Sequence, residues 1–205
     1  MKMPVCAFAT LLVSVSVWAG GGPLGIDHIL RRDDSSGAFS RSSQLAAMDL
    51  SIIAVLGGAL YEGNDSRLGR TFWQATDSML VTAVAAEGTK LVFRRQRPVN
   101  GNDPDAWFAS RHDRSFPSGE VAHMAAIVTP FIAEYRHDTP AVWALAALPL
   151  YVGAGRLKSQ AHWQTDVLAG AALGGGIGYL IHTHNANFSA SVLPRGFSIG
   201  YHTSF

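Results

Sequence analysis

The sequence predicts an all-α protein: a helical bundle of about five to six helices, followed by a short strand-like C-terminal tail. Hydrophobic residues make up 48% of the 205-residue chain and charged residues only 15%, a balance that suits a heavily buried helical protein. Long apolar stretches are separated by turns rich in glycine, proline and polar residues. The length is sufficient for one domain with a substantial core.

Five stretches have the pattern of helices, bounded by residues typical of helix ends. The expected helices are 45–62, 69–94, 119–135, 140–154 and 162–182. The first stops at Gly63, and the fourth begins with Pro140, which is common in a first helical turn. Glycines 174–176 in the fifth helix predict close packing against another helix. Residues 196–205 alternate with a period of two, so we expect an edge strand that packs on the helices.

The N-terminus has the features of a secretory signal peptide over residues 1–19. Lys2 precedes an apolar run that is short for a membrane span and ends in small residues before Ala19. Cleavage there would remove Cys6, the single cysteine, so the mature chain could form no disulfide. Residues 20–44 are rich in glycine, serine and charge, which predicts a flexible leader before a helical domain 45–205. We expect a periplasmic or secreted protein, with an uncleaved anchor and inner-membrane association as the alternative.

Charge and helix length bear on the expected partners. A net charge of +1 gives no reason to expect nucleic-acid binding. Stretch 140–154 is shorter than the roughly 20 residues of a membrane span. Stretch 69–94 is polar and 45–62 contains Asp49, so the pattern favours a soluble domain. Stretches 45–62 and 162–182 are nearly long enough to cross a bilayer, which leaves membrane embedding, peripheral membrane contact and homo-oligomer formation open.

The chemistry of the chain centres on Arg156, His162 and Asp166. His162 and Asp166 are four residues apart, so on a helix they share one face. A carboxylate there can hold one imidazole nitrogen as N–H and leave the other as a nucleophile or base. Arg156 supplies a planar fork of donors suited to a phosphate-like anion. Taken alone, this stretch is equally compatible with an ordinary helix N-terminus.

Two further stretches could bind the same anion. Lys90 and Arg97 are seven residues apart, so two helical turns bring both cations to nearly the same face. An ordinary basic helix end explains the adjacent Arg94 and Arg95 well but Lys90 poorly. Ser118 directly precedes the helix expected at 119–135, where backbone N–H groups and a hydroxyl form an anion site, although a simple N-cap serine has the same pattern.

In chain order the three motifs are Lys-x6-Arg-Pro, Pro-Ser-Gly and Arg-x5-His-x3-Asp. This combination resembles the type 2 phosphatidic acid phosphatase superfamily, which includes bacterial class A acid phosphatases and vanadium haloperoxidases. The matching stretches extend from Lys90 to Asp166, about two-fifths of the chain. The resemblance implies no metal and no cofactor, attack of His162 on phosphorus to form a phosphohistidine, and orientation of His162 by Asp166. It also implies that the phosphoryl oxygens are bound by Lys90, Arg97, Ser118, Gly119 and Arg156.

The chain departs from the family pattern at two positions. Gly155 stands where the family usually has a serine, and Glu120 stands where it has the histidine that protonates the leaving group. Nearby oxyanions would raise the pKa of Glu120, whereas the arginines would lower it. If the oxyanions prevail, Glu120 is the general acid. His123, one helical turn later, is a second candidate, and a weakened or altered enzyme is the third possibility.

The expected function is therefore that of an exported, metal-independent phosphatase acting on phosphate monoesters or lipid (di)phosphates through a phosphohistidine. An exposed site in a soluble fold would favour a non-specific phosphomonoesterase. Apolar Trp107 and Phe108 in the long loop 99–116 would favour a lipid phosphate if they face a membrane. The alternatives are a vanadate-dependent haloperoxidase, for which the chain is short, and a catalytically impaired phosphate-binding homologue, which Glu120 motivates.

Overall fold

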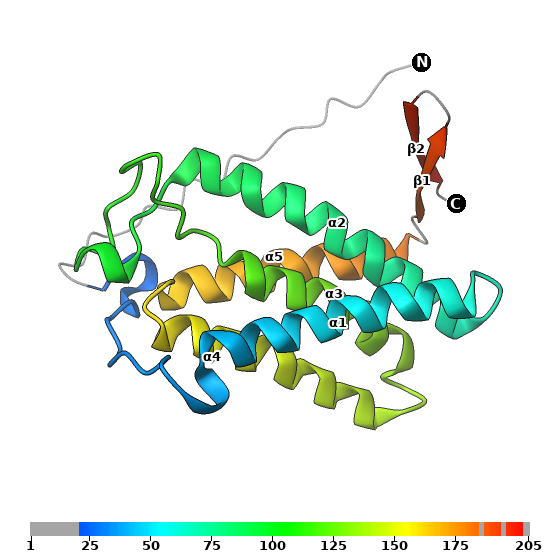
Figure 1. The fold of residues 1–205 in the computed structure, drawn as a ribbon, viewed down its shortest axis with the longest axis horizontal. Coiled ribbons are helices and arrows are strands. Elements are labelled where there is room, and N and C mark those ends of the chain that lie inside the picture. The colour runs from blue at the N-terminus through cyan, green and yellow to red at the C-terminus, as the bar shows by residue number, and fades with distance from the viewer. Residues whose placement is uncertain (1–20, 185–186, 194–195, 203–205) are drawn as a thin grey trace, which may run out of the picture.

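The computed structural model describes residues 21–184, 187–193 and 196–202, with side chains for residues 21–184. The predicted signal peptide, 1–19, lies outside the described residues. Within them, five α-helices form an elongated bundle, which confirms the all-α prediction (Figure 1). The helices are α1 (Arg41–Glu62), α2 (Arg67–Phe93), α3 (Gly119–Tyr135), α4 (Ala147–Lys158) and α5 (Gln164–Thr183). Short 3-10 helices are η1 (Pro23–Gly25), η2 (Gly37–Phe39), η3 (Pro98–Asn100) and η4 (Pro140–Ala146).

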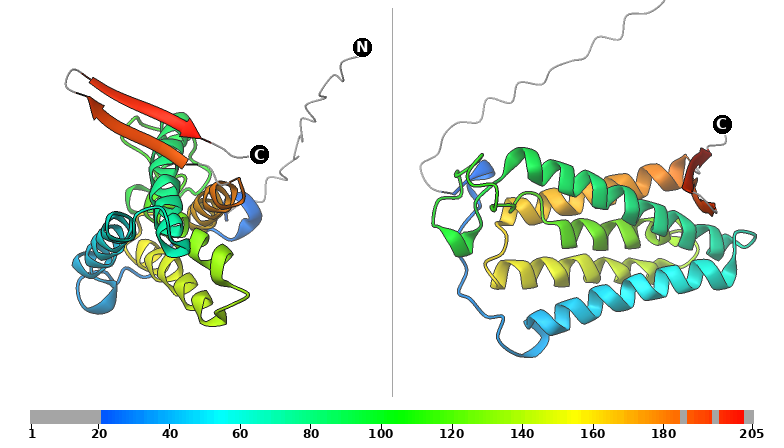
Figure 2. Two further views of the ribbon diagram at one scale, coloured as in Figure 1. Left: turned by 90° about the vertical axis from the view of Figure 1, so that its right-hand side faces the viewer. Right: turned by 45° about the horizontal axis from the view of Figure 1, so that its top comes forward.

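Helix α3 lies at the centre of the bundle and contacts all four other helices, most extensively α5 and α2 (Figure 2). Its buried side chains are almost all apolar, as expected for a helix covered on every side. Gly174 of α5 lies against the backbone of Ala122. A Cβ at position 174 would come within 1.9 Å of the Ala122 carbonyl oxygen, so only glycine fits there. The close packing predicted for the glycine-rich part of α5 is thus confirmed at Gly174.

Capping interactions set two helix boundaries that differ from the predicted ones. Helix α1 begins at Arg41, before the predicted residue 45, because the Ser40 hydroxyl accepts a hydrogen bond from the Ser43 amide. Helix α5 begins at Gln164, because the carboxylate of Asp166 accepts from the backbone N–H of Trp163 at 2.9 Å. His162 therefore lies in the turn before α5, not on one helix with Asp166 as predicted.

The segment before α1 is not the loose leader that its composition predicted for residues 20–44. Asp27 is buried and accepts hydrogen bonds from the guanidinium of Arg95 at 2.6 Å and from the backbone N–H of Thr165 at 2.8 Å. A buried carboxylate requires such partners, and here they come from distant parts of the chain. Composition alone could not show that this segment is tied to the start of α5.

Two strands follow α5 and pair antiparallel: β1 (Asn187–Leu193) and β2 (Gly196–His202). They lie at the end of the bundle where α5 ends (Figure 1). Residues 196–202 of the period-two pattern form β2, residues 203–205 lie outside the described residues, and β1 was not predicted. The expected packing of the tail on the helices depends on side chains outside the described residues.

Two helical segments carry extensive exposed apolar surface. Helix α1 and the continuous segment Pro140–Lys158, which joins η4 to α4, are long and apolar enough to cross a membrane by length and composition. Only 22% of each apolar window is buried. The prediction that the fourth helix is too short for a span was therefore wrong, because the helical segment extends through Arg156 to Lys158. Its exposed side chains include Trp143 and Leu150, and those of α1 include Leu50, Ile53 and Leu60.

Candidate active site

The predicted site residues meet at the end of the bundle where α1, α3 and α5 begin and α2 and α4 end (Figure 1, left). Lys90 is in the last turn of α2, and Arg156 is in the last turn of α4. Ser118 and Gly119 stand at the start of α3, and His162 lies two residues before the start of α5. Because the N-termini of α3 and α5 carry partial positive charge, this end of the bundle favours an anion.

His162 is oriented by the backbone of Ser115. Its Nδ1 lies 2.6 Å from the Ser115 carbonyl oxygen. A carbonyl oxygen only accepts hydrogen bonds, so Nδ1 carries the proton and Nε2 retains its lone pair. Burial lowers the pKa of His162, the nearby Asp166 opposes this effect, and the charges of Arg97 and Arg156 add to it. The imidazole is therefore neutral near pH 7 and suited to nucleophilic attack.

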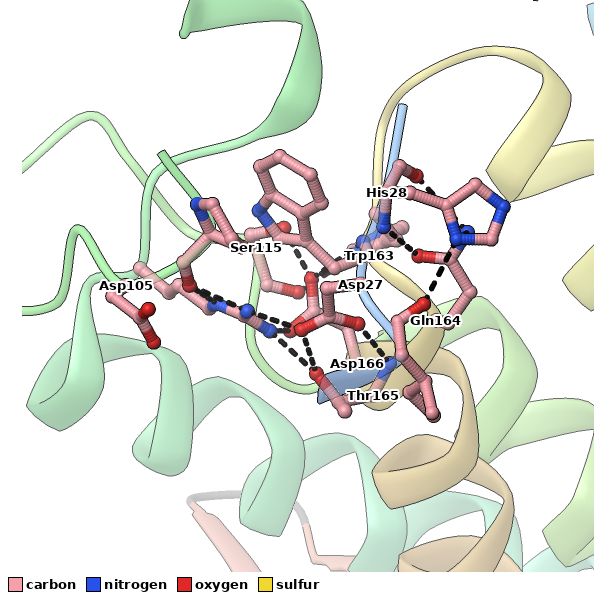
Figure 3. Close-up of polar contacts among 12 residues, drawn as sticks. Asp27, His28, Asp105, Ser115, Trp163, Gln164, Thr165 and Asp166 are labelled. Atoms are coloured by element: carbon pink, nitrogen blue, oxygen red, sulfur yellow. Dashed lines mark hydrogen bonds and ion pairs between the residues drawn. The ribbon is translucent and has the colours of Figure 1, made fainter. Parts of the chain in front are cut away.

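The expected hydrogen bond between Asp166 and His162 does not form. Asp166 places its Oδ2 3.9 Å from His162 Nδ1. Its oxygens instead accept from Arg95 at 2.6 Å, from the Ser115 hydroxyl, and from the Trp163 N–H (Figure 3). Burial acts to raise the pKa of Asp166, but His162, Arg95 and Ser115 outweigh it, so the pKa lies below its usual value. Asp166 and His162 thus both contact Ser115: the hydroxyl donates to Asp166, and the carbonyl accepts from the imidazole.

Arg95 is the central buried residue that sequence analysis missed. Its side chain is fully buried and joins Asp27 to Asp166, with a distance of 2.6 Å to each carboxylate. It also donates to the Thr165 hydroxyl and lies 4.5 Å from the ring of Trp107. The interpretation of Arg95 as part of an ordinary basic helix end was wrong, since its partners lie far away in the sequence.

The two aromatic residues of the long loop, Trp107 and Phe108, differ in their surroundings. Trp107 covers Arg95 and packs edge-on against Phe93 and Phe116. Phe108 is 59% exposed. Of the two aromatic side chains that would favour a lipid substrate if they faced a membrane, Phe108 is exposed, whereas the partly buried Trp107 packs over the buried ion network.

Two buried donors at this end of the bundle have no hydrogen-bond partner in the described part of the chain: Ser118 Oγ, before α3, and Arg156 Nε, in the last turn of α4. Ser118 is not a side-chain N-cap, so the simpler explanation for this serine fails. Its backbone N–H donates to the Asp166 carbonyl at 2.9 Å. Buried donors in folded proteins are rarely left unpaired, and the oxygens of a bound anion are acceptors of the kind that such donors need.

Lys90 and Arg97 lie at the same site. A Cβ on Gly119 would fall 2.7 Å from Lys90 Nζ, so the ammonium group lies directly against the first residue of α3. Lys90 Nζ also pairs with Glu87 at 2.6 Å. Besides burial, which is the main cause, the charge of Arg97 helps to lower the pKa of both His162 and Arg156. The structure thus brings together the cations that the motifs predicted.

Glu120 is an ionised carboxylate in an ion pair. Its Oε2 accepts from Arg41 Nη1 at 2.8 Å and lies 3.7 Å from Arg156 Nη1. Burial acts to raise the pKa of Glu120, but Arg41, Arg156 and His162 outweigh it, so the pKa lies below its usual value. The arginines thus outweigh burial, and the effect of phosphoryl oxygens on the pKa of Glu120 stays a prediction.

The second candidate acid is directed toward its own helix. His123 Nδ1 lies 3.2 Å from the carbonyl oxygen of Gly119, one turn earlier in α3. Since the carbonyl only accepts, this nitrogen donates its proton there. Nδ1 of His123 is therefore not available to protonate a leaving group.

The side chain of Gln44, on α1, fills the space beside Gly155 that a larger residue would need. A Cβ at position 155 would lie 2.4 Å from Gln44 Cδ. Gln44 is buried, donates to the Phe39 carbonyl at 2.7 Å, and places its Oε1 3.5 Å from Arg156 Nη1. A polar neighbour for Arg156 thus comes from α1, and a serine at position 155 would occupy the same space.

Comparison with known proteins agrees with this geometry. Residues 72–189 match the sequence profile of the PAP2 superfamily. The chain belongs to the PAP2 superfamily. The matched segment contains every predicted site residue and leaves out α1, which supplies Arg41 and Gln44.

Two individual proteins are similar to this PAP2 chain. It is 31% identical over 127 residues to the lipid A 1-phosphatase of Porphyromonas gingivalis, a match that covers 59% of this chain and 26% of that protein. The chain thus spans about a quarter of the length of this relative. Its fold is similar to the crystal structure of Aquifex aeolicus LpxE, with a TM-score of 0.51 and 19% identity over 67% of this chain and 81% of the other.

Proposed function

We propose that this PAP2 protein is a phosphatase of lipid phosphates or diphosphates that works through a phosphohistidine on His162. The observation that carries the proposal is the pair of unpartnered buried donors, Ser118 Oγ and Arg156 Nε, at the same bundle end as this histidine. A neutral imidazole with a free Nε2 supplies the nucleophile. The donors supply the binding site for the phosphoryl group.

In the proposed mechanism, the cations neutralise the phosphoryl oxygens while Ser118 and the backbone N–H of Gly119 position them. His162 Nε2 attacks phosphorus, the bond to the leaving oxygen breaks, and a phosphohistidine forms. Water then hydrolyses the phosphohistidine and releases phosphate. Positioning and charge stabilisation provide most of the catalysis of phosphoryl transfer, which is what Lys90, Arg97 and Arg156 can supply here.

The exposed apolar helices support a substrate with a lipid tail. Large apolar side chains of α1 and of Pro140–Lys158 face outward from the bundle. Exposed apolar surface of this extent is typical of proteins that contact a membrane or a partner. The similarity to a lipid A 1-phosphatase points the same way. We therefore place the protein at a membrane surface after export, with its phosphate site at one end of the bundle.

Turnover of three substrates tests this proposal: p-nitrophenyl phosphate, a phosphatidate and a polyprenyl diphosphate, each with and without detergent micelles. The protein is expected to release phosphate from at least one lipid faster than from p-nitrophenyl phosphate. His162→Ala should abolish release from every substrate. Equal turnover by His162→Ala, or a preference for the water-soluble ester, would contradict the proposal.

The second candidate function is phosphate binding without turnover. The ion pairs of Glu120 with Arg41 and Arg156 favour it, because they occupy cations that would otherwise face the substrate. Vanadate binding measured by calorimetry, together with no phosphate release from the three substrates, would support this candidate over the phosphatase.

A further inference from the structure

The first turn of α1 brings a further arginine to the phosphate site. Arg41 lies outside the segment that matches the PAP2 superfamily, yet its Nη1 is 2.8 Å from Glu120 Oε2. Glu120 stands one residue after Gly119, and its carboxylate also lies 3.7 Å from Arg156. The side chain of Arg41 is about half exposed, so it lies on the solvent side of the buried Arg156.

The reaction creates a negative charge that this corner of the site must accommodate. When the phosphorus–oxygen bond breaks, the electron pair stays on the leaving oxygen. An alcohol leaves readily only if an acid protonates that oxygen, which is worth about 10²–10⁴ in rate. Glu120 is held ionised by two arginines and has no proton to give. The site instead has the guanidinium of Arg41 beside Glu120.

We infer that Arg41 is a further active-site residue, which together with Glu120 adapts the site to substrates whose leaving group departs as an anion without receiving a proton. Diphosphate esters form the lipid class with this property, because their leaving group is itself a phosphate. This inference rests on the proposed phosphatase function and narrows its substrate class. A guanidinium has five N–H donors, so Arg41 can bind Glu120 and a second phosphate together.

The proposed step balances without an added proton. The bond from His162 Nε2 to the terminal phosphorus forms as the bond from that phosphorus to the bridging oxygen breaks. The electron pair remains on the bridging oxygen, which leaves as part of a lipid monophosphate. Arg41 stabilises this departing phosphate by a charge-assisted hydrogen bond. Water later cleaves the phosphohistidine, and its proton passes to the released phosphate or to solvent.

Matched substrates test the leaving-group preference. We would measure kcat/KM for farnesyl diphosphate against farnesyl monophosphate, and for p-nitrophenyl phosphate against phenyl phosphate, whose leaving group is the weaker acid. The protein is expected to favour farnesyl diphosphate over the monophosphate by about 10² or more, the factor that a missing general acid predicts. It should also favour p-nitrophenyl phosphate strongly over phenyl phosphate. Equal rates within either pair would overturn the inference.

Variants separate a catalytic role of Arg41 from a structural one. Arg41→Gln is expected to lower kcat/KM for farnesyl diphosphate by about tenfold or more, the worth of one charge-assisted hydrogen bond. It should lower kcat/KM for p-nitrophenyl phosphate by a smaller factor, because that leaving group has no phosphate for Arg41 to bind. Glu120→His should selectively raise turnover of phenyl phosphate and farnesyl monophosphate. A loss shared equally by all substrates in Arg41→Gln would mean that Arg41 only anchors α1, which overturns the inference.

Arg70→Gln is the matched control, because Arg70 is exposed on α2, about 30 Å from Lys90 at the helical rise per residue. Arg70→Gln should leave the kcat/KM ratio within each substrate pair unchanged.

The two proposals fail in different ways. No turnover of any substrate, including p-nitrophenyl phosphate, would refute the phosphatase proposal itself. Turnover that requires His162 but has the same kcat/KM for good and poor leaving groups would refute only the role of Arg41 and Glu120.

Discussion

His162 Nδ1 donates its hydrogen bond to the carbonyl oxygen of Ser115 at 2.6 Å, although the carboxylate of Asp166 is only 3.9 Å away. A backbone carbonyl thus holds the protonated Nδ1, and the Asp166 carboxylate contacts the hydroxyl of the same serine. Asp166 instead joins Arg95, the Ser115 hydroxyl and the first turn of α5. Ser115 therefore connects His162 to the buried ion pair of Asp166 and Arg95.

Ser115→Ala separates the two functions of Ser115. The variant loses the hydrogen bond to the ionised Asp166, which should lower the free energy of unfolding by about 1.5–3 kcal/mol. It keeps the backbone carbonyl that orients His162, so kcat/KM should fall by less than about tenfold. Urea unfolding and steady-state kinetics measure both effects. A loss of activity of a thousandfold in a folded variant would show that the hydroxyl, not the carbonyl, governs the histidine.

Arg95→Met should destabilise the protein more than any substitution at the exposed arginines. It leaves the buried carboxylates of Asp27 and Asp166 without their shared cation, which typically costs about 3–5 kcal/mol. Arg111→Met, at an exposed position in the same loop region, should change stability by no more than about 0.5 kcal/mol. Denaturant unfolding compares the two variants. Similar midpoints for both would contradict the buried network.

The pKa of His162 should lie below the value of a free histidine, about 6.5, because burial disfavours the charged imidazole. Between pH 6.5 and the lower pKa of the folded protein, His162 is protonated in the unfolded chain but not in the folded one. The free energy of unfolding should therefore fall as the pH drops from about 6.5 to the folded pKa, and no further below it. NMR titration of the imidazole locates this pKa, and His162→Gln should remove this part of the pH dependence. A titration midpoint above 6.5 would contradict the account.

Gly155→Ser should be destabilising because its Cβ meets the side chain of Gln44. Overpacking of this kind costs about 1–3 kcal/mol. In the double variant with Gln44→Ala the clash is absent, so the two single effects should not add, and the coupling should exceed about 0.5 kcal/mol. A double-mutant cycle from urea unfolding measures the coupling. Strict additivity would show that Gly155 and Gln44 do not share space.

The helices and most of the site could be predicted from the sequence because the signals for them are local. Apolar stretches ending at Gly63 or beginning at Pro140 indicate helices without knowledge of the fold. The motifs singled out Lys90, Arg97 and Arg156, which lie at one end of the bundle. The helical spacing expected for the first two was wrong, because α2 ends at Phe93 and Arg97 lies beyond it in extended backbone. The glycine-rich part of α5 also indicated close packing, which Gly174 confirms.

The features that sequence analysis missed depend on partners far apart in the chain. Arg95 is buried because Asp27, 68 residues earlier, and Asp166, 71 residues later, meet it. Glu120 is ionised because Arg41 reaches it from 79 residues away. One error had a local signal that was available. Asp166 is the third residue of α5, where a carboxylate commonly caps the preceding amide, and this placement puts His162 outside the helix.

The most direct test of the account is to trap the covalent intermediate on His162. The protein would be mixed with a substrate carrying labelled phosphorus, quenched in alkali within one turnover, and digested for mass spectrometry. We predict an alkali-stable, acid-labile phosphoryl group on the peptide that contains His162, and no label in His162→Ala. A label on another residue, or turnover in the unmodified protein with no labelled enzyme at any quench time, would contradict the phosphohistidine mechanism.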